Sequence, residues 1–267
     1  MTFETKPANA MLTSVQHKLS AKSAALLLSI ESSLPRLMTG WFVIALLASM
    51  LRITFSPLHA ALELETLLPY LLLVTAPLLS MGLALHWFRD GHLQPQPVTR
   101  LARVGRWRNV GRAEAQSHPL YGSSGIMVSL LVGMLLNVPV RALEYLAAIP
   151  SLSGTVPAWL STLHLMMTLD VVLLSSLYTI AFVAALRGVP LFPRLLAAIW
   201  AIDLAMQLGI ASAVAGTEGL PPRVAEALHT LLDGNTKKVL ISIGLWLPYL
   251  LLSKRVNVTY RHRVESV

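Results

Sequence analysis

The chain lacks two features that most soluble proteins have. It contains no cysteine among its 267 residues, which excludes disulfide bonds and thiolate chemistry at a metal or redox centre. It is also short of charge, because Asp, Glu, Lys and Arg make up 13% of the residues while apolar residues make up 55%. Average soluble domains contain about 25% charged residues, so this composition excludes an ordinary soluble fold and predicts that the lipid bilayer is the solvent.

The motifs of common enzymes are missing as well. The chain has no Gly-rich phosphate loop, no His-Glu-x-x-His zinc pair and no Gly-x-Ser-x-Gly nucleophile elbow. Ser124-Gly125 and Ser153-Gly154 offer hydroxyl groups, but serine beside glycine is more typical of helix ends and close packing. The sequence therefore predicts no catalytic residue and no metal site, and an intramembrane hydrolase using His164 and a serine is a third hypothesis.

The net charge of +8 raises the question of whether the protein binds nucleic acid. The basic residues stand at the ends of apolar runs, and no soluble domain is present to carry them. Arginines in that position are what insertion into a membrane and anionic lipid select. We therefore expect no nucleic-acid partner, and we expect contact with anionic lipid on the cytoplasmic side.

Six apolar stretches bounded by charge, Pro or Gly approach or exceed the about 20 residues that cross a bilayer as a helix. They cover residues 37–57, 66–87, 123–148, 157–186, 191–215 and 237–253. The predicted fold class is all-α, a polytopic membrane helix bundle with six transmembrane helices.

Basic residues accumulate in alternate connections of this bundle. The segment after the second span, the turn after the fourth and the C-terminal tail carry most of the arginines, whereas residues 57–66 and 151–156 carry no Lys or Arg. Short loops rich in Lys and Arg remain on the cytoplasmic side. The sequence thus predicts that both termini are cytoplasmic.

Two segments favour a position on the membrane surface. Residues 1–35 form a predicted N-terminal arm. In Val98–Arg112, apolar residues recur every third position between arginines, which is typical of a short basic helix in the interface. A solvated charged loop is the alternative, and both interpretations remain open. The arginines expected to face lipid are Arg100, Arg103, Arg106, Arg108 and Arg112.

The end of the chain carries the most specific pattern, Leu245-Trp-Leu-Pro-Tyr-Leu-Leu-Leu-Ser-Lys-Arg-Val-Asn-Val-Thr-Tyr, and Leu186-Arg-Gly-Val-Pro-Leu-Phe-Pro-Arg forms a basic turn. Together they resemble DUF2569, a family of small bacterial inner-membrane proteins with a domain of unknown function. The resemblance covers about residues 119–263 and implies a four-span unit in the bacterial inner (cytoplasmic) membrane. The family has no assigned activity, so it implies no catalytic residues.

The predicted organisation has five parts. They are a cytoplasmic arm with a possible interfacial helix (1–35), a two-helix hairpin (36–88), a basic cytoplasmic loop (89–118), the four-helix DUF2569-like unit (119–255) and a basic cytoplasmic tail (256–267).

Ionisable residues within the spans are costly and mark a functional hypothesis. Asp170 and Asp203 fall at similar depth on two spans joined by a short turn, so we expect them to face one another. Arg141 and Glu144 are spaced i, i+3 and can meet on one helix surface. His164 and Asp170 lie on different faces of their helix, so we expect no direct contact between them. A polar collar on the periplasmic side is predicted from Arg52, Glu63, Glu65, Arg141, Glu144 and Lys238.

Two functions are consistent with these residues. The first is a non-catalytic accessory or scaffold subunit of a membrane complex, in which the intramembrane carboxylates hold helices together. The alternative is a small proton-coupled transporter or channel that uses Asp170 and Asp203, with His164 as an outer relay. No cofactor is expected, although His164 could serve as an axial ligand to haem or chlorophyll.

Overall fold

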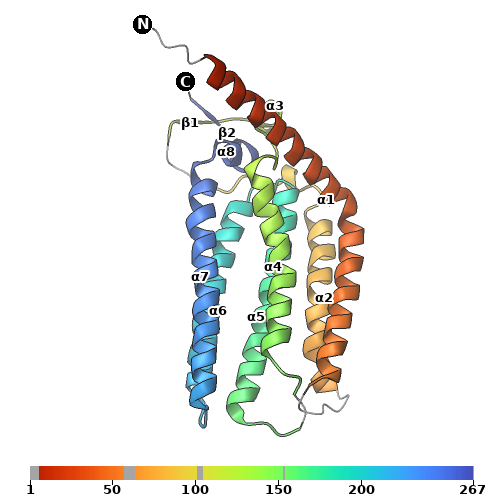
Figure 1. The fold of residues 1–267 in the computed structure, drawn as a ribbon. Coiled ribbons are helices and arrows are strands. Elements are labelled where there is room, and N and C mark those ends of the chain that lie inside the picture. Colours follow the sequence, from red (N-terminus) through yellow and green to blue (C-terminus); the bar gives the residue numbers. More distant parts are fainter. Residues whose placement is uncertain (1–5, 57–63, 101–104, 153, 267) are drawn as a thin grey trace.

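The computed structural model describes residues 6–56, 64–100, 105–152 and 154–266. Predictions that concern Glu63, Arg103 and Ser153 lie outside these residues. In the described part the chain is helical, apart from one short pair of strands (Figure 1). The long helices are α1 (Lys6–Thr54), α2 (Leu64–Trp87), α4 (Ile126–Ala148), α5 (Ala158–Leu186), α6 (Phe192–Ala215) and α7 (Pro222–Leu252). The short elements are η1 (Gly91–Leu93), α3 (Arg112–Ser117), α8 (Lys254–Arg261), β1 (Trp107–Asn109) and β2 (Arg263–Glu265).

Five of these helices, α1, α2, α4, α5 and α6, are long and apolar enough to cross a bilayer. α7 passes the same test only together with α8, and the two helices meet at an angle of 70°. Counting that bent pair as one span gives up to six. The all-α fold class is confirmed, and the protein is a multi-pass membrane protein.

α5 is the central helix of the bundle. It packs against α2, α4 and α6, while α1 lies against α2 and α4, and α7 lies against α6 (Figure 1). Its sequence suits this position, because it contains neither Pro nor Gly and has apolar residues on every side. Large side chains such as Leu174 and Phe182 are fully buried there. The bundle is thus a core of α4, α5 and α6 flanked by α1–α2 on one side and α7 on the other.

One end of the bundle is closed by the last residues of the chain, and we call it the capped end. Here β2 pairs antiparallel with β1, so that Trp107 is opposite Glu265. The hydroxyl of Tyr260 in α8 donates to the carbonyl of Ala185 at 2.9 Å and lies 2.8 Å from the hydroxyl of Ser123. α1 also begins at this end (Figure 1). The interfacial helix predicted over Val98–Arg112 is not formed at residues 107–109, because this stretch pairs with β2 instead.

Two helices begin earlier than predicted. α1 is continuous from Lys6, with Pro35 inside it, so no break separates residues 6–35 of the predicted arm from the first span. Pro35 lacks the N–H of a normal helix bond, and Figure 1 shows α1 changing direction along its length, as a proline allows. α7 begins at Pro222 rather than near residue 237, because its first half is a charged, amphipathic helix that a search for apolar runs does not detect.

Candidate functional site

The most polar part of the bundle interior is centred on Arg141 of α4. Its Nη1 atom donates to Oδ2 of Asp170 on α5, and its Nη2 atom donates to Oδ2 of Asp203 on α6, both at 2.7 Å. Asp170 is 4% exposed and Asp203 is fully buried. One guanidinium therefore joins three helices, and we call Arg141, Asp170 and Asp203 the ion cluster. The predicted proximity of the two carboxylates is confirmed.

Neighbouring side chains complete the hydrogen bonding of the ion cluster. The Tyr178 hydroxyl donates to Oδ2 of Asp203 at 3.0 Å. The Gln207 amide nitrogen donates to Oδ1 of Asp170 at 3.2 Å and lies 3.5 Å from Oδ1 of Asp203. The Gln207 amide oxygen is buried and has no hydrogen-bond partner among the described residues. The cluster thus combines one positive charge, two negative charges and one unused acceptor.

The ion cluster lies at the depth of the membrane core. Arg141 is 15 residues from Ile126, about 22 Å along α4 at the standard helical rise. Asp170 is 16 residues from Leu186, about 24 Å along α5. Both helix ends belong to the capped end, and the hydrocarbon core of a bilayer is about 30 Å thick. The charges therefore lie in the half of the membrane remote from the capped end, where bulk water does not neutralise them.

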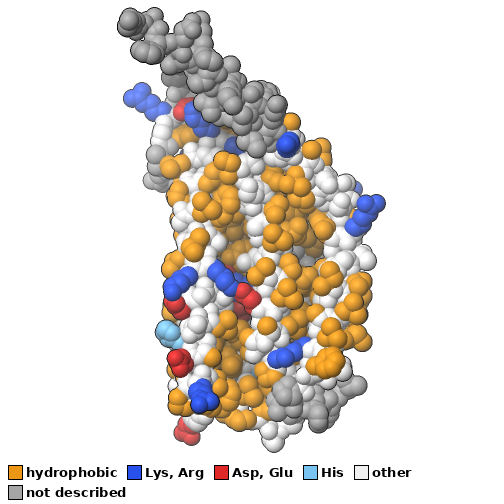
Figure 2. Space-filling model, in the orientation of Figure 1, with side chains coloured by type: hydrophobic (Ala, Val, Ile, Leu, Met, Phe, Trp, Pro, Cys, Tyr) orange, Lys and Arg blue, Asp and Glu red, His pale blue; other side chains and the backbone are white. Residues whose placement is uncertain are grey.

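A second set of charges lies on α7 beside the ion cluster. Lys238 pairs with Glu144 of α4 and also donates to Asn235 at 3.3 Å. The adjacent Lys237 pairs with Asp233, one turn earlier on α7, at 2.6 Å. Lys237, Lys238 and Asp233 are exposed, with 59% of the Lys238 side chain accessible, whereas Glu144 and Asn235 are half-buried. Figure 2 shows basic and acidic side chains together at mid-height of the bundle and along one edge.

Three cavities separate α7 from the ion cluster. One of about 60 Å³ lies between α4 and α7 and touches Arg141, Asp203 and Lys238. A smaller one, about 10 Å³, reaches Asp170. The largest, about 370 Å³, lies between α6 and α7 and has Gln207 in its wall. The two small cavities hold a few waters at most, because each water needs roughly 10–15 Å³ of such volume.

Other predicted site residues are placed elsewhere. Arg141 and Glu144 do not pair with one another as expected, because each has a partner on another helix. Nε of Arg52 donates to the carbonyl of Ile149 at 3.0 Å, so Arg52 takes no part in the ion cluster. Glu65 is exposed on α2. The predicted collar is therefore reduced, within the described residues, to Arg141, Glu144 and Lys238.

His164 is separate from the carboxylates, as expected from its face of the helix. Its Nε2 atom lies 3.5 Å from the Tyr145 hydroxyl, which in turn is 2.8 Å from the Thr168 hydroxyl. Within the described residues no hydrogen bond joins this group to Asp170, so the outer relay lacks its connecting step. A role of His164 in binding a tetrapyrrole stays a prediction. No group of three His, Asp or Glu suited to a metal ion occurs in the part of the chain that the structure describes.

Sequence reasoning missed Tyr178 and the bridging role of Gln207. Gln207 is four residues after Asp203, so both side chains fall on the same face of α6, and that spacing was an available signal. No sequence spacing predicted the role of Tyr178, because its contact with Asp203 depends on how α5 and α6 are rotated against one another.

The predicted lipid-facing arginines hold the capped end together. Arg100 donates to the carbonyl of Arg261 at 2.7 Å, Arg112 donates to the carbonyl of Leu93 at 2.6 Å, and Arg108 pairs with Glu114 at 2.5 Å. Arg106 contributes its carbonyl, which accepts from the Ser266 amide. Burial, together with the charges of Arg112 and Arg100, lowers the pKa of His262 below its ordinary value.

Comparisons with models of protein families, with curated proteins and with solved structures found no match. The resemblance to DUF2569 therefore stays a prediction that rests on the two sequence patterns at residues 186–194 and 245–260.

Proposed function

We propose that the protein is a non-catalytic accessory or scaffold subunit of the bacterial inner membrane, and that the charged face of α7 packs against another membrane protein. The observation that carries this proposal is the pair Lys238–Glu144, which lies on the surface of the bundle at membrane depth. Lys238 is 14 residues from Leu252, about 21 Å from that end of α7.

Charged side chains at this depth are unfavourable in contact with lipid. Translocon-based scales give about 2.5–3.5 kcal/mol for one Lys or Asp at the centre of a membrane helix. Pairing with Glu144 reduces this cost, but 59% of the Lys238 side chain stays exposed, and Asn235, its second hydrogen-bond partner, is only half-buried. A polar helix of a partner would supply hydrogen bonds to them, which is how membrane helices associate.

The ion cluster supports a structural role for the rest of the bundle. Interhelical polar contacts contribute about 0.6 kcal/mol on average in membranes, up to about 1.7 kcal/mol. Arg141 makes two such contacts with carboxylates on different helices, so α4, α5 and α6 are fixed against one another. The rigid core would then present α7 in a constant orientation.

The proposal places six spans in the membrane, with the α7–α8 pair as the sixth and both termini in the cytoplasm. In support, α1 begins at the capped end, where β2 also lies (Figure 1). The arginines of the basic loop and tail gather at the same end, in agreement with the positive-inside rule. Anionic lipid is then the expected partner of this end, and a DUF2569-like unit would comprise α4 to α8.

Site-specific crosslinking tests the partner directly, because a chain without cysteine gives clean single-cysteine variants. Asn235→Cys places the probe on the charged face of α7, and Leu79→Cys places it on an exposed apolar position of α2 as the matched control. We expect a defined heterologous adduct in native membranes from position 235 and none from position 79. Equal crosslinking from both positions, or crosslinks only to a second copy of the chain, would contradict the proposal that the protein is an accessory subunit.

A second candidate is a proton or monovalent cation site, and the charge balance of the ion cluster favours it. Arg141 neutralises one of the two carboxylates, which leaves one negative charge. The Gln207 amide oxygen also has no donor in the part of the chain that the structure describes. A bound proton or small cation would balance the remaining negative charge and give the Gln207 oxygen a partner. The cavity between α6 and α7 reaches Gln207.

Liposome flux separates this candidate from the first. The purified protein is reconstituted with a pH-sensitive dye inside, and wild type is compared with Asp170→Asn, Asp203→Asn and the control Lys238→Met. Proton or sodium flux that is lost in both aspartate variants and retained in the control would support transport. If wild type gives no flux of either ion, the transporter hypothesis fails.

A further inference from the structure

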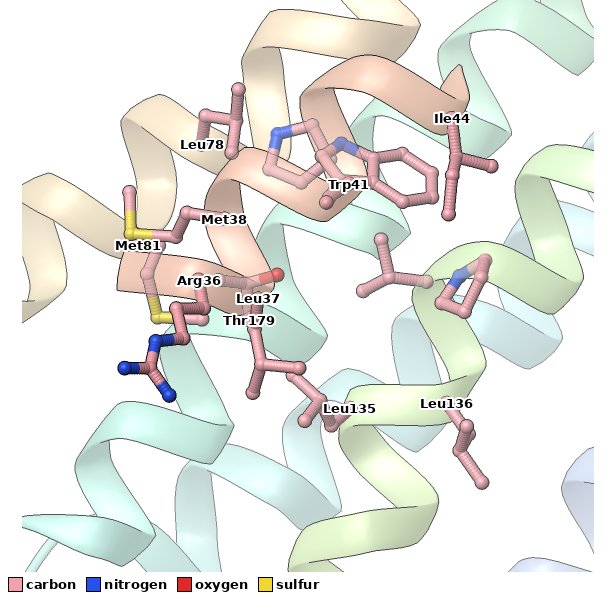
Figure 3. A pocket seen from close by; sticks show the side chains of 14 residues that line it. Arg36, Leu37, Met38, Trp41, Ile44, Leu78, Met81, Leu135, Leu136 and Thr179 are labelled. Atoms are coloured by element: carbon pink, nitrogen blue, oxygen red, sulfur yellow. The ribbon is translucent and has the colours of Figure 1, made fainter. Parts of the chain in front are cut away.

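A lateral groove of about 320 Å³ lies between α1, α2 and α4, on the side of the bundle away from α7. Figure 3 shows Arg36 and Met81 toward one side of it and Ile44 toward the other, and Trp41 and Leu136 also line it. Apart from Arg36 and Thr179, the lining consists of apolar side chains and one glycine. The volume is within the range of about 300–1,000 Å³ typical of small-molecule sites.

The wall of the groove that α1 contributes includes Gly40. Gly40 lacks a side chain, and a Cβ atom built there would meet nothing within 4 Å. Pro77 of α2 and Pro139 of α4 also line the groove, and proline leaves a backbone carbonyl without its helical donor. Three of the lining residues, Gly40, Pro77 and Pro139, thus lack a long side chain that could fill the space.

Arg36 gives the groove one charged end. It forms no hydrogen bond or ion pair with any residue that the structure describes. By contrast Glu31, five residues earlier on α1, pairs with Arg187 at the end of α5, at 3.1 Å. Arg36 is thus about 8 Å further from the capped end than Glu31, a distance that a long arginine side chain spans to reach the membrane interface.

We propose that this groove binds an anionic phospholipid of the leaflet at the capped end, with one acyl chain along Gly40 and Trp41 and the phosphate on Arg36. A guanidinium is suited to phosphate because it donates two parallel hydrogen bonds. The apolar wall accepts the chain, and the concave shape distinguishes this lipid from those that cover the flat faces of α1 and α2. The inference does not depend on the partner proposed for α7.

Native mass spectrometry of the purified protein tests the site, with phosphatidylglycerol and phosphatidylcholine of identical acyl chains as the probes. Gly40→Leu fills the groove and keeps the charge, and Arg36→Gln removes the charge and keeps the groove. Gly82→Leu is the matched control, because a Cβ atom at Gly82 also meets nothing within 4 Å and Gly82 does not line the groove.

We expect wild type and Gly82→Leu to retain one phosphatidylglycerol about tenfold more tightly than phosphatidylcholine. Both lipids offer a phosphate to Arg36, but the choline cation of phosphatidylcholine offsets the negative charge that the guanidinium attracts. Arg36→Gln should lose the preference, and Gly40→Leu should lose both lipids. The proposal is overturned if wild type shows no preference for phosphatidylglycerol, or if Gly40→Leu retains it as wild type does. Size-exclusion profiles show whether each variant folds. If Gly40→Leu does not fold, the proposal is tested by the lipid preference of wild type and by the loss of that preference in Arg36→Gln.

Discussion

The charge balance of the ion cluster predicts an asymmetry between its members. Replacing Arg141 by Met leaves Asp170 and Asp203 buried together with no positive charge, although both are at most 4% exposed. Removing one partner of a buried ion pair costs about 3–5 kcal/mol. Replacing Asp170 by Asn instead leaves one positive and one negative charge, so the cluster becomes neutral.

The Gln207 side chain should make Asp170→Asn inexpensive. In the native protein its amide nitrogen faces Oδ1 of Asp170, and its amide oxygen is unpaired. If the amide rotates by half a turn, that oxygen can accept from the new Asn amide while the Asn carbonyl still accepts from Arg141. The Gln207 nitrogen then gives up only its long contact, 3.5 Å, with Oδ1 of Asp203. The remaining cost is the change from a charged to a neutral hydrogen bond, about 1 kcal/mol.

Thermal unfolding of the purified protein in one detergent measures both variants. We expect Arg141→Met to be less stable than Asp170→Asn by about 2–4 kcal/mol, the difference between the two costs above. The triple variant Arg141→Met, Asp170→Asn, Asp203→Asn should recover part of the loss because no buried charge remains. The reasoning is refuted if Asp170→Asn is as destabilising as Arg141→Met, or if the triple variant recovers nothing.

Three further predictions concern the surface and the capped end. The Lys238–Glu144 pair is exposed, so Lys238→Met should change stability in detergent by less than about 1 kcal/mol, yet it should weaken the crosslink from position 235 if α7 has a partner. Tyr260→Phe removes the hydroxyl that donates to Ala185 and should lower the unfolding free energy by about 1 kcal/mol, since Ser123 still donates to that carbonyl. The pKa of His262 is lowered from 6.5 in the folded protein, so the unfolded chain binds more protons below that pH, and the capped end should lose stability as the pH falls below 6.5. The protection factor of the Val110 amide in hydrogen exchange should fall at mildly acidic pH in wild type, because this amide donates to the His262 carbonyl. It should not fall in His262→Asn, which keeps the fold because Asn tolerates the φ of 46°.

The central helices could be predicted from the sequence because their ends are marked. Pro157 precedes α5, Arg187-Gly188 follows it, and α6 ends before Gly216, so the predicted limits agree with the structure within a few residues. α1 and α7 could not be delimited in this way. Pro35 is accommodated within α1, and the charged first half of α7 is helical without being apolar.

The candidate site was only partly predictable for a related reason. The depth of Asp170 and Asp203 follows from counting residues along the hairpin that α5 and α6 form. Their common partner, Arg141, could not be predicted in this way. The rotation of α4 about its own axis decides whether Arg141 faces Glu144, lipid or the interior. That rotation is set by side-chain packing along the whole helix, which no local spacing encodes.

The pairing of β1 with β2 has a consequence for how the protein is made. Residues 107–109 leave the ribosome early, but their hydrogen-bonding partners at residues 263–265 follow only after α4, α5, α6 and α7. Throughout the insertion of those helices the arginine-rich loop has to remain without its strand partner. Closure of this end is therefore a late event in biogenesis. It can take place only after every preceding segment has been translated.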